Sequence, residues 1–148
     1  MGAGMILGFV AVVPFFKHET VKAEALLNPP PQIYDKSLPK IFSGIREVLS
    51  ESAYPMGDRW RIVKADTQTG HIIAELRFAN DAIDFKDRRS IVRRYVEADF
   101  KLRPDANGTI LQSAYKVELE GFQYWACDRI IRATQAAINK KSLAISSH

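Results

Sequence analysis

The chain has 148 residues, of which 47% are hydrophobic and 26% are charged. This length suits one domain, and the hydrophobic content excludes a disordered chain, which could not build a core. The single cysteine, Cys127, excludes an internal disulfide framework and a zinc site built from several cysteines. The net charge of +4 is modest, so it favours acidic partners only where basic residues cluster.

Residues 2–16 carry no charged side chain and are almost wholly apolar. The run is shorter than the roughly 20 residues that cross a bilayer, and its length matches the apolar part of a signal peptide. Small residues within 21–25 offer a cleavage site, although no Lys or Arg precedes the apolar run. Three interpretations of residues 1–25 stay open: a signal peptide, a short membrane anchor, or a buried element of the fold. The first two predict a secreted, periplasmic or membrane-anchored domain, and the third leaves a cytoplasmic location open.

Three consecutive prolines at 29–31 form a stiff, extended spacer, so residues 26–36 are predicted to be a linker. A helix follows, with Asp35 or Ser37 as its cap and Pro39 tolerated in its first turn. Its apolar residues recur at three- and four-residue spacing and predict one buried stripe: Leu38, Ile41, Phe42, Ile45, Val48 and Leu49.

Four strands are predicted next, at 59–65, 70–78, 91–103 and 110–119. Apolar and polar residues alternate along the last three, which is typical of strands with one buried face. Asn107 and Gly108 tolerate positive φ and indicate a hairpin between the third and fourth strands.

Residues 122–140 then carry an apolar stripe that predicts a second helix, and 142–148 are predicted to be a flexible tail. Strands in series with one apolar face favour an antiparallel sheet covered by helices on that face. We therefore predict an α+β domain over residues 37–141, in which a four-stranded antiparallel sheet has an N-terminal and a C-terminal helix packed on one face.

Four short motifs resemble an uncharacterised family of small bacterial and plastid domains of unknown function. The resemblance implies the order helix, four strands, helix over about residues 37–140, often behind an N-terminal membrane or export segment, and implies no activity. Where the family has Ser-Arg-x-Gly after the fourth strand, residues 115–121 read Tyr-Lys-Val-Glu-Leu-Glu-Gly. The motifs are Trp60-Arg61-Ile62-Val63, Gly70-His71-Ile72-Ile73-Ala74, Phe85-Lys86-Asp87 leading to Ile91-Val92-Arg93, and Ala126-Cys127-Asp128-Arg129-Ile130.

No residue pattern predicts a metal site, a cofactor or a catalytic group. The three histidines lie far apart in the sequence, and Cys127 has no histidine beside it in the sequence. The acidic residues at 81, 84 and 87 lack the spacing and the glycine of an EF-hand.

A basic cluster is the strongest candidate binding site: Lys86, Arg88, Arg89 and Arg93 form a possible anion- or partner-binding patch. Acidic residues are interleaved with these cations, so ion pairing across the sheet is the favoured interpretation, with arginines facing Glu75, Glu97 and Asp99. Aromatic residues are too scarce on the outward face to indicate a nucleic-acid platform.

The leading functional hypothesis is a non-catalytic domain, outside the cytoplasm or at a membrane, that binds a protein or membrane partner. It would act through the outward sheet face or the arginine-rich loop, and its oligomeric state stays open. A different hypothesis is an enzyme that uses the loop residues Asp84, Asp87 and Arg88. Another is a carrier for a small apolar ligand or lipid, in a cavity between a curved sheet and a helix, lined by Phe78, Phe100, Tyr115, Phe122 and Trp125.

Overall fold

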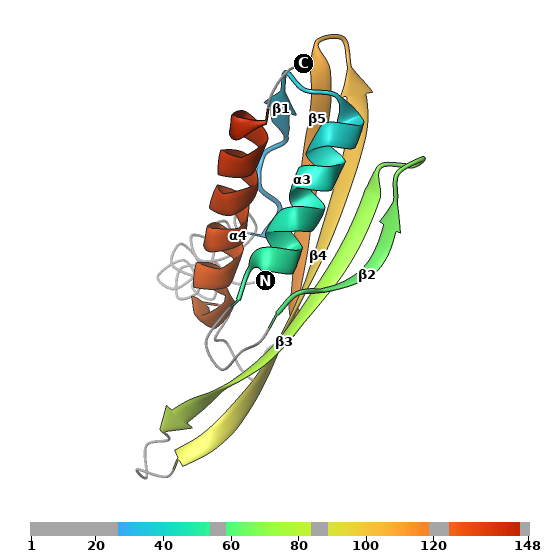
Figure 1. Ribbon diagram of the computed structural model, residues 1–148. Helices are drawn as coiled ribbons and strands as arrows, with labels where there is room; N and C mark the ends of the chain where they lie inside the picture. The colour runs from blue at the N-terminus through green and yellow to red at the C-terminus, as the bar shows by residue number, and fades with distance from the viewer. Residues whose placement is uncertain (1–26, 54–58, 84–88, 119–124, 146–148) are drawn as a thin grey trace, which may run out of the picture.

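The computed structural model describes residues 27–53, 59–83, 89–118 and 125–145. Within them the chain forms two long helices and one sheet (Figure 1). In chain order the elements are β1 (Gln32–Tyr34), α3 (Leu38–Glu51), β2 (Arg61–Asp66), β3 (His71–Ile83), β4 (Arg89–Asp105), β5 (Gly108–Glu118) and α4 (Trp125–Ala144).

The sheet is antiparallel throughout, with the strand order β1-β5-β4-β3-β2. The prediction of an α+β fold with an antiparallel sheet and two helices is confirmed. The prediction of four strands is wrong, because the sheet has five. Figure 1 shows the β3–β4 hairpin continuing past the ends of the neighbouring strands.

The additional strand, β1, lies inside the segment predicted to be a linker. It has only three residues, which is too short for an alternating pattern to be recognised. It pairs with β5 from Tyr34 opposite Thr109 to Gln32 opposite Leu111. Pro31 directly precedes it, and proline has no N–H to donate to a ladder, so β1 cannot extend further towards the N-terminus as a regular strand.

Alternation along the three central strands separates the sheet into an apolar face and a polar face. On the apolar face the side chains of β3, β4 and β5 are almost fully buried. They form one core with the inward stripe of α3, and burial of this apolar surface is the main favourable term in folding. The members from the sheet include Ile72, Leu76, Val96, Phe100 and Leu111.

Helix α3 begins at Leu38 with Pro39 in its first turn, as predicted, and buries the predicted stripe. Figure 1 shows α4 lying beside α3. The Tyr34 hydroxyl donates a hydrogen bond to Asn139 (3.2 Å), which joins α4 to β1. Lys141 of α4 forms an ion pair with Glu47 of α3 (2.5 Å), and Glu47 raises the pKa of Lys141.

None of the helices in the described residues has the length and apolar composition needed to cross a bilayer.

Two glycines occupy positions that exclude a side chain. Gly70 has φ +67°, and a Cβ atom there would collide with the backbone oxygen of Leu102. A Cβ atom at Gly108 would collide with the backbone oxygen of Tyr34. Gly108 opens β5 after the two turn residues 106–107, so the predicted hairpin is confirmed.

We expect Gly70→Ala to lower the free energy of unfolding by about 1–3 kcal/mol, because it combines left-handed backbone with a backbone collision. Gly44→Ala is the matched control. In α3 its Cβ atom would meet only side chains, at 3.0 Å from Ile145 and 3.4 Å from Lys141, and alanine favours the helix. Urea denaturation of both variants checks this, and an equal loss at the two positions would contradict it.

Candidate functional site

The basic cluster predicted as a binding patch is only partly within the described residues. Lys86 and Arg88 lie outside them. Arg89 and Arg93 lie in β4, opposite Ile83 and Ala79 of β3, and their side chains are outside the described part. The enzyme hypothesis rests on Asp84, Asp87 and Arg88, which also lie outside the described residues.

Two of the five residues predicted to line an apolar cavity have described side chains. Phe100 and Tyr115 are buried in the core and contact each other edge to face, with ring centroids 5.9 Å apart. Phe78 lies in β3 and Trp125 at the start of α4, with side chains outside the described part, and Phe122 lies outside the described residues. Neither Phe100 nor Tyr115 lines either of the two surface concavities described below.

The face of the sheet opposite the core carries a continuous set of polar side chains, which we call the open face. It consists of residues that alternate along each strand with the buried ones. Its described members include Arg61 on β2, His71, Glu75 and Arg77 on β3, Tyr95, Glu97, Asp99 and Lys101 on β4, and Lys116 on β5.

Two carboxylates lie directly opposite each other at the centre of the open face. Glu75 on β3 pairs in register with Glu97 on β4, an arrangement that destabilises a sheet unless other groups compensate. Arg61 provides compensation from β2: its Nε donates to Glu75 Oε1 (2.9 Å), and its Nη2 contacts the same oxygen. These hydrogen bonds lower the pKa of Glu75, against the opposing effect of burial.

The hydroxyl of Tyr95 lies between the same two carboxylates, 3.0 Å from Glu97 Oε2 and 3.3 Å from Glu75 Oε2. Burial and the neighbouring carboxylates raise the pKa of Tyr95 to about 12. The phenol therefore stays protonated at neutral pH and donates its hydrogen to the carboxylate pair. This holds the aromatic ring in a fixed position on the open face.

A concavity of about 350 Å³ lies beside this ring. The guanidinium of Arg77 sits over Tyr95, 5.3 Å from the ring centroid, within range of a cation–π interaction. The other wall is formed by Lys116, which pairs in register with Glu97. The lining is thus two cations, one carboxylate, an aromatic ring and one apolar side chain: Arg77, Lys116, Glu97, Tyr95 and Val117.

A second pair of polar side chains lies further along the open face. His71 Nε2 is 2.7 Å from Asp99 Oδ1, and both side chains are partly exposed. The pair bridges β3 and β4 and adds to the cross-strand interactions that order this surface.

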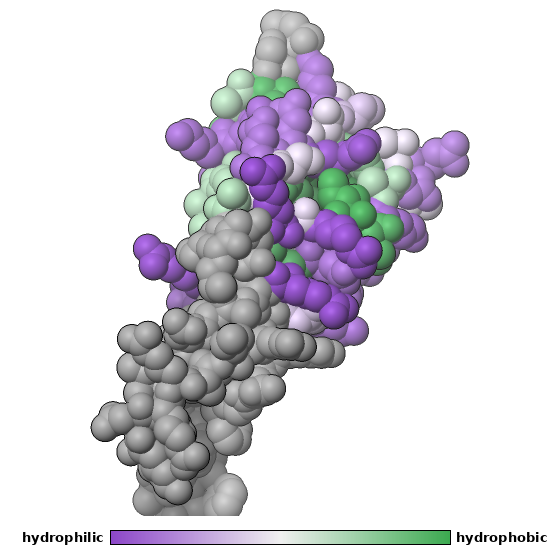
Figure 2. Space-filling view, turned by 60° about the horizontal axis from the view of Figure 1, so that its bottom comes forward, coloured by the Kyte–Doolittle hydropathy of each residue, from purple (hydrophilic) through white to green (hydrophobic). Residues whose placement is uncertain are grey.

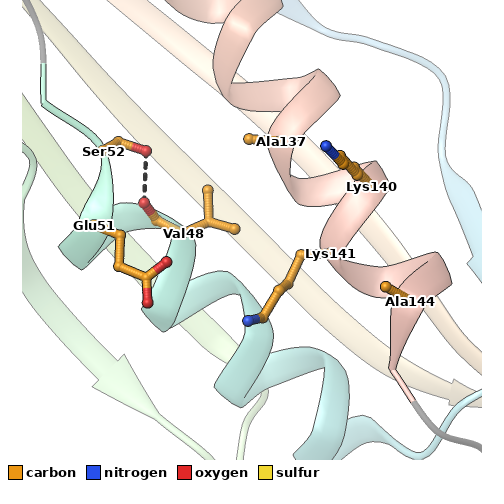
Figure 3. Close-up of a pocket in the computed structure, with 7 residues that line it drawn as sticks. All are labelled: Val48, Glu51, Ser52, Ala137, Lys140, Lys141 and Ala144. Carbon is orange, nitrogen blue, oxygen red and sulfur yellow. Dashed lines mark hydrogen bonds between the residues drawn. The ribbon is translucent and has the colours of Figure 1, made fainter.

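The helices form another concavity, of about 330 Å³, on the surface between α3 and α4 (Figure 3). Apolar lining comes from Val48, Ala137 and Ala144, and Lys140 lies at its edge. The Ser52 hydroxyl donates to the Val48 carbonyl oxygen (2.6 Å) and so satisfies an acceptor at the end of α3. The groove is lined by few groups that could orient a ligand.

The surface chemistry is that of a binding surface. Among the described residues, no group of three or more His, Cys, Asp or Glu side chains is placed to hold a metal ion. Figure 2 turns the lower end of the molecule in Figure 1 towards the viewer, and the coloured surface there is mostly hydrophilic, with hydrophobic areas between polar side chains. Large exposed hydrophobic residues in the described part are scattered rather than gathered: Ile33, Val63 and Leu143.

Sequence reasoning identified ion pairing across the outward face but assigned the wrong cation to Glu75. Its partner is Arg61 on β2, while Arg77 stacks on Tyr95. Lys116 was not predicted as a site residue. The alternation along 110–119 had placed it outward, but the pairing of Lys116 with Glu97 depends on the register of β4 and β5.

No protein-family model matches the chain, and a search of curated proteins finds no significant match.

We expect Arg61→Gln to raise the pKa of Glu75 towards the ordinary glutamate value, because the hydrogen bonds that lower it are lost. The folded-state pKa is the lowered one, so this pair stabilises the fold above the ordinary glutamate pKa and stops doing so as the pH falls through the lowered value. Side-chain carboxyl NMR titration measures the shift. The control Arg59→Gln removes an exposed arginine just before β2, and an equal rise there would contradict the assignment.

Proposed function

We propose that this chain is a non-catalytic binding domain whose open sheet face contacts a protein partner. The observation that carries the proposal is the organisation of that face around Tyr95. A buried-side hydroxyl, two carboxylates and two arginines hold one another in place before any partner arrives. A preordered polar surface binds at a lower entropic cost than one whose side chains must be fixed on contact.

The proposal assigns different roles to the two faces of the sheet. The apolar face is taken up by the core, and both helices are placed over it. The open face then remains as the large surface available to a partner, with the concavity beside Tyr95 as its most enclosed part. Its mixture of charges suits a polar interface that discriminates between partners by electrostatic complementarity.

The proposal also places the domain outside the cytoplasm or at a membrane face. The support is the uncharged apolar run at residues 2–16, which precedes the domain in the sequence and lies outside the described residues. A membrane anchor would make neighbouring membrane proteins the expected partners, and a cleaved signal peptide would make the partner a secreted or periplasmic protein.

Photo-crosslinking in cells of the native host tests the proposed interface. A photoreactive residue replaces Lys101 on the open face in one variant and Lys140 beside the helix groove in the other, two exposed lysines on different surfaces. We expect a discrete crosslinked adduct from position 101 and none from position 140. Adducts from position 140 alone, or from neither position, would contradict the proposal.

The same cells test the location. Separation into membrane and soluble fractions, with the N-terminus of each species determined, should give an intact chain in the membrane or a shortened exported one. An unprocessed chain in the cytosol would contradict this part of the proposal.

A further inference from the structure

The outer edge of β5 is only partly covered by β1. Strand β1 pairs with Thr109, Ile110 and Leu111, while β5 continues to Glu118. Extension of β1 in the same register would bring the prolines at 31, 30 and 29 opposite residues 112, 113 and 114. Prolines cannot donate to the ladder, so they end this pairing. In the described part of the chain, no strand pairs with this edge beyond Leu111.

The register shows which backbone groups lie along that edge. Asp105 and Gly108 flank a two-residue turn, so they form a hydrogen-bonded pair, and such pairs alternate with non-bonded pairs along β4 and β5. Pro104 opposite Thr109 falls on a non-bonded pair, as a residue without N–H must. Ser113 and Val117 fall on non-bonded pairs too, so their backbone N–H and C=O groups lie on the side away from β4.

The opposite edge of the sheet is protected against strand addition, and this part of β5 is much less so. Strand β2 is short, carries exposed Lys64, and has a register shift between Ile62 and Lys64. Charged residues and bulges of this kind are the devices by which natural sheets block edge pairing. Strand β5 keeps one register with β4 from Gly108 to Glu118, so its edge offers a regular template.

The side chains beside this edge indicate what a partner strand would carry. Ala114 and Lys116 belong to the open face, and Lys116 also lines the concavity with Arg77. Two cations against the single carboxylate of Glu97 leave an excess of one positive charge, which one carboxylate would balance. The Val117 side chain lies on the opposite, half-buried side, where an apolar neighbour is favoured.

We propose that an extended, acidic segment of a protein partner adds as a sixth strand to the edge of β5 from Gln112 to Glu118. Its backbone bonds to Ser113 and Val117, a carboxylate on its open side binds Lys116 and Arg77, and the alternate side chains are apolar. Backbone hydrogen bonds supply the affinity in this mode of recognition and the alternate side chains supply the specificity. This inference rests on the proposed function and names the partner and the manner of binding.

The test uses the isotope-labelled full-length chain and two blocked seven-residue peptides, one alternating valine with glutamate and one alternating valine with lysine. Amide hydrogen exchange followed by NMR should slow at Ser113 and Val117 when the glutamate peptide is added, and not with the lysine peptide. Equal slowing with both peptides, or with neither, would overturn the proposal.

Two variants separate the backbone and charge contributions. Val117→Pro removes an edge N–H without removing a hydrogen bond to β4, and should abolish the slowing at Ser113. Lys116→Glu should weaken binding of the glutamate peptide roughly tenfold, because an attractive charge pair becomes repulsive. Lys64→Glu on β2 makes the same change of charge at the other edge and should leave binding unaltered. Circular dichroism confirms that each variant is folded.

The alternative occupants have their own signatures. Slow exchange at Ser113 and Val117 before any peptide is added would show that the chain itself or a second copy fills the edge, and sedimentation would distinguish monomer from dimer; either result overturns the proposal. Crosslinking from position 101 without peptide binding at β5 would overturn this inference and leave the proposed function standing. Loss of both would remove the two together.

Discussion

The two-residue alternation of β3, β4 and β5 is the constraint on which the rest of this structure depends. Each central strand places one set of side chains in the core and the next set on the open face. A shift of one residue in the pairing of any two strands would bury Glu75, Glu97 or Asp99 and expose Leu76, Val96 or Phe100. The core therefore fixes the register, and the register places Glu75 opposite Glu97 and Glu97 opposite Lys116. The polar network is thus a consequence of how the apolar face packs.

Much of the fold could be predicted because its long elements carry strong periodic signals. Helix α3 and the three central strands have enough residues for a pattern of 3.6 or 2 to be recognised. Strand β1 could not be predicted, because three residues show no period and proline-rich sequence is typical of linkers. It is a strand because its backbone bonds to β5 and the Tyr34 side chain enters the core, both of which depend on residues more than 70 positions away.

The site was less predictable than the fold. Sequence alternation indicates that Arg61, Arg77, Tyr95 and Lys116 face the same way, but not which of them meet. The pairing of Arg61 with Glu75, and the position of Tyr95 between two carboxylates, follow from the register across three strands. Local charge density pointed instead to the cluster at 86–93, because neighbours in sequence are visible without a structure and neighbours across a sheet are not.

The central claim is that the open face is covered by a partner where the protein works. Hydroxyl-radical footprinting of Tyr95 in intact cells of the native host and in the purified chain tests this most directly, with Leu143 on α4, 61% exposed, as the internal reference. The account predicts that Tyr95 is oxidised less in cells than in the purified protein while Leu143 is oxidised equally in both. Equal oxidation of Tyr95 in the two samples would contradict it.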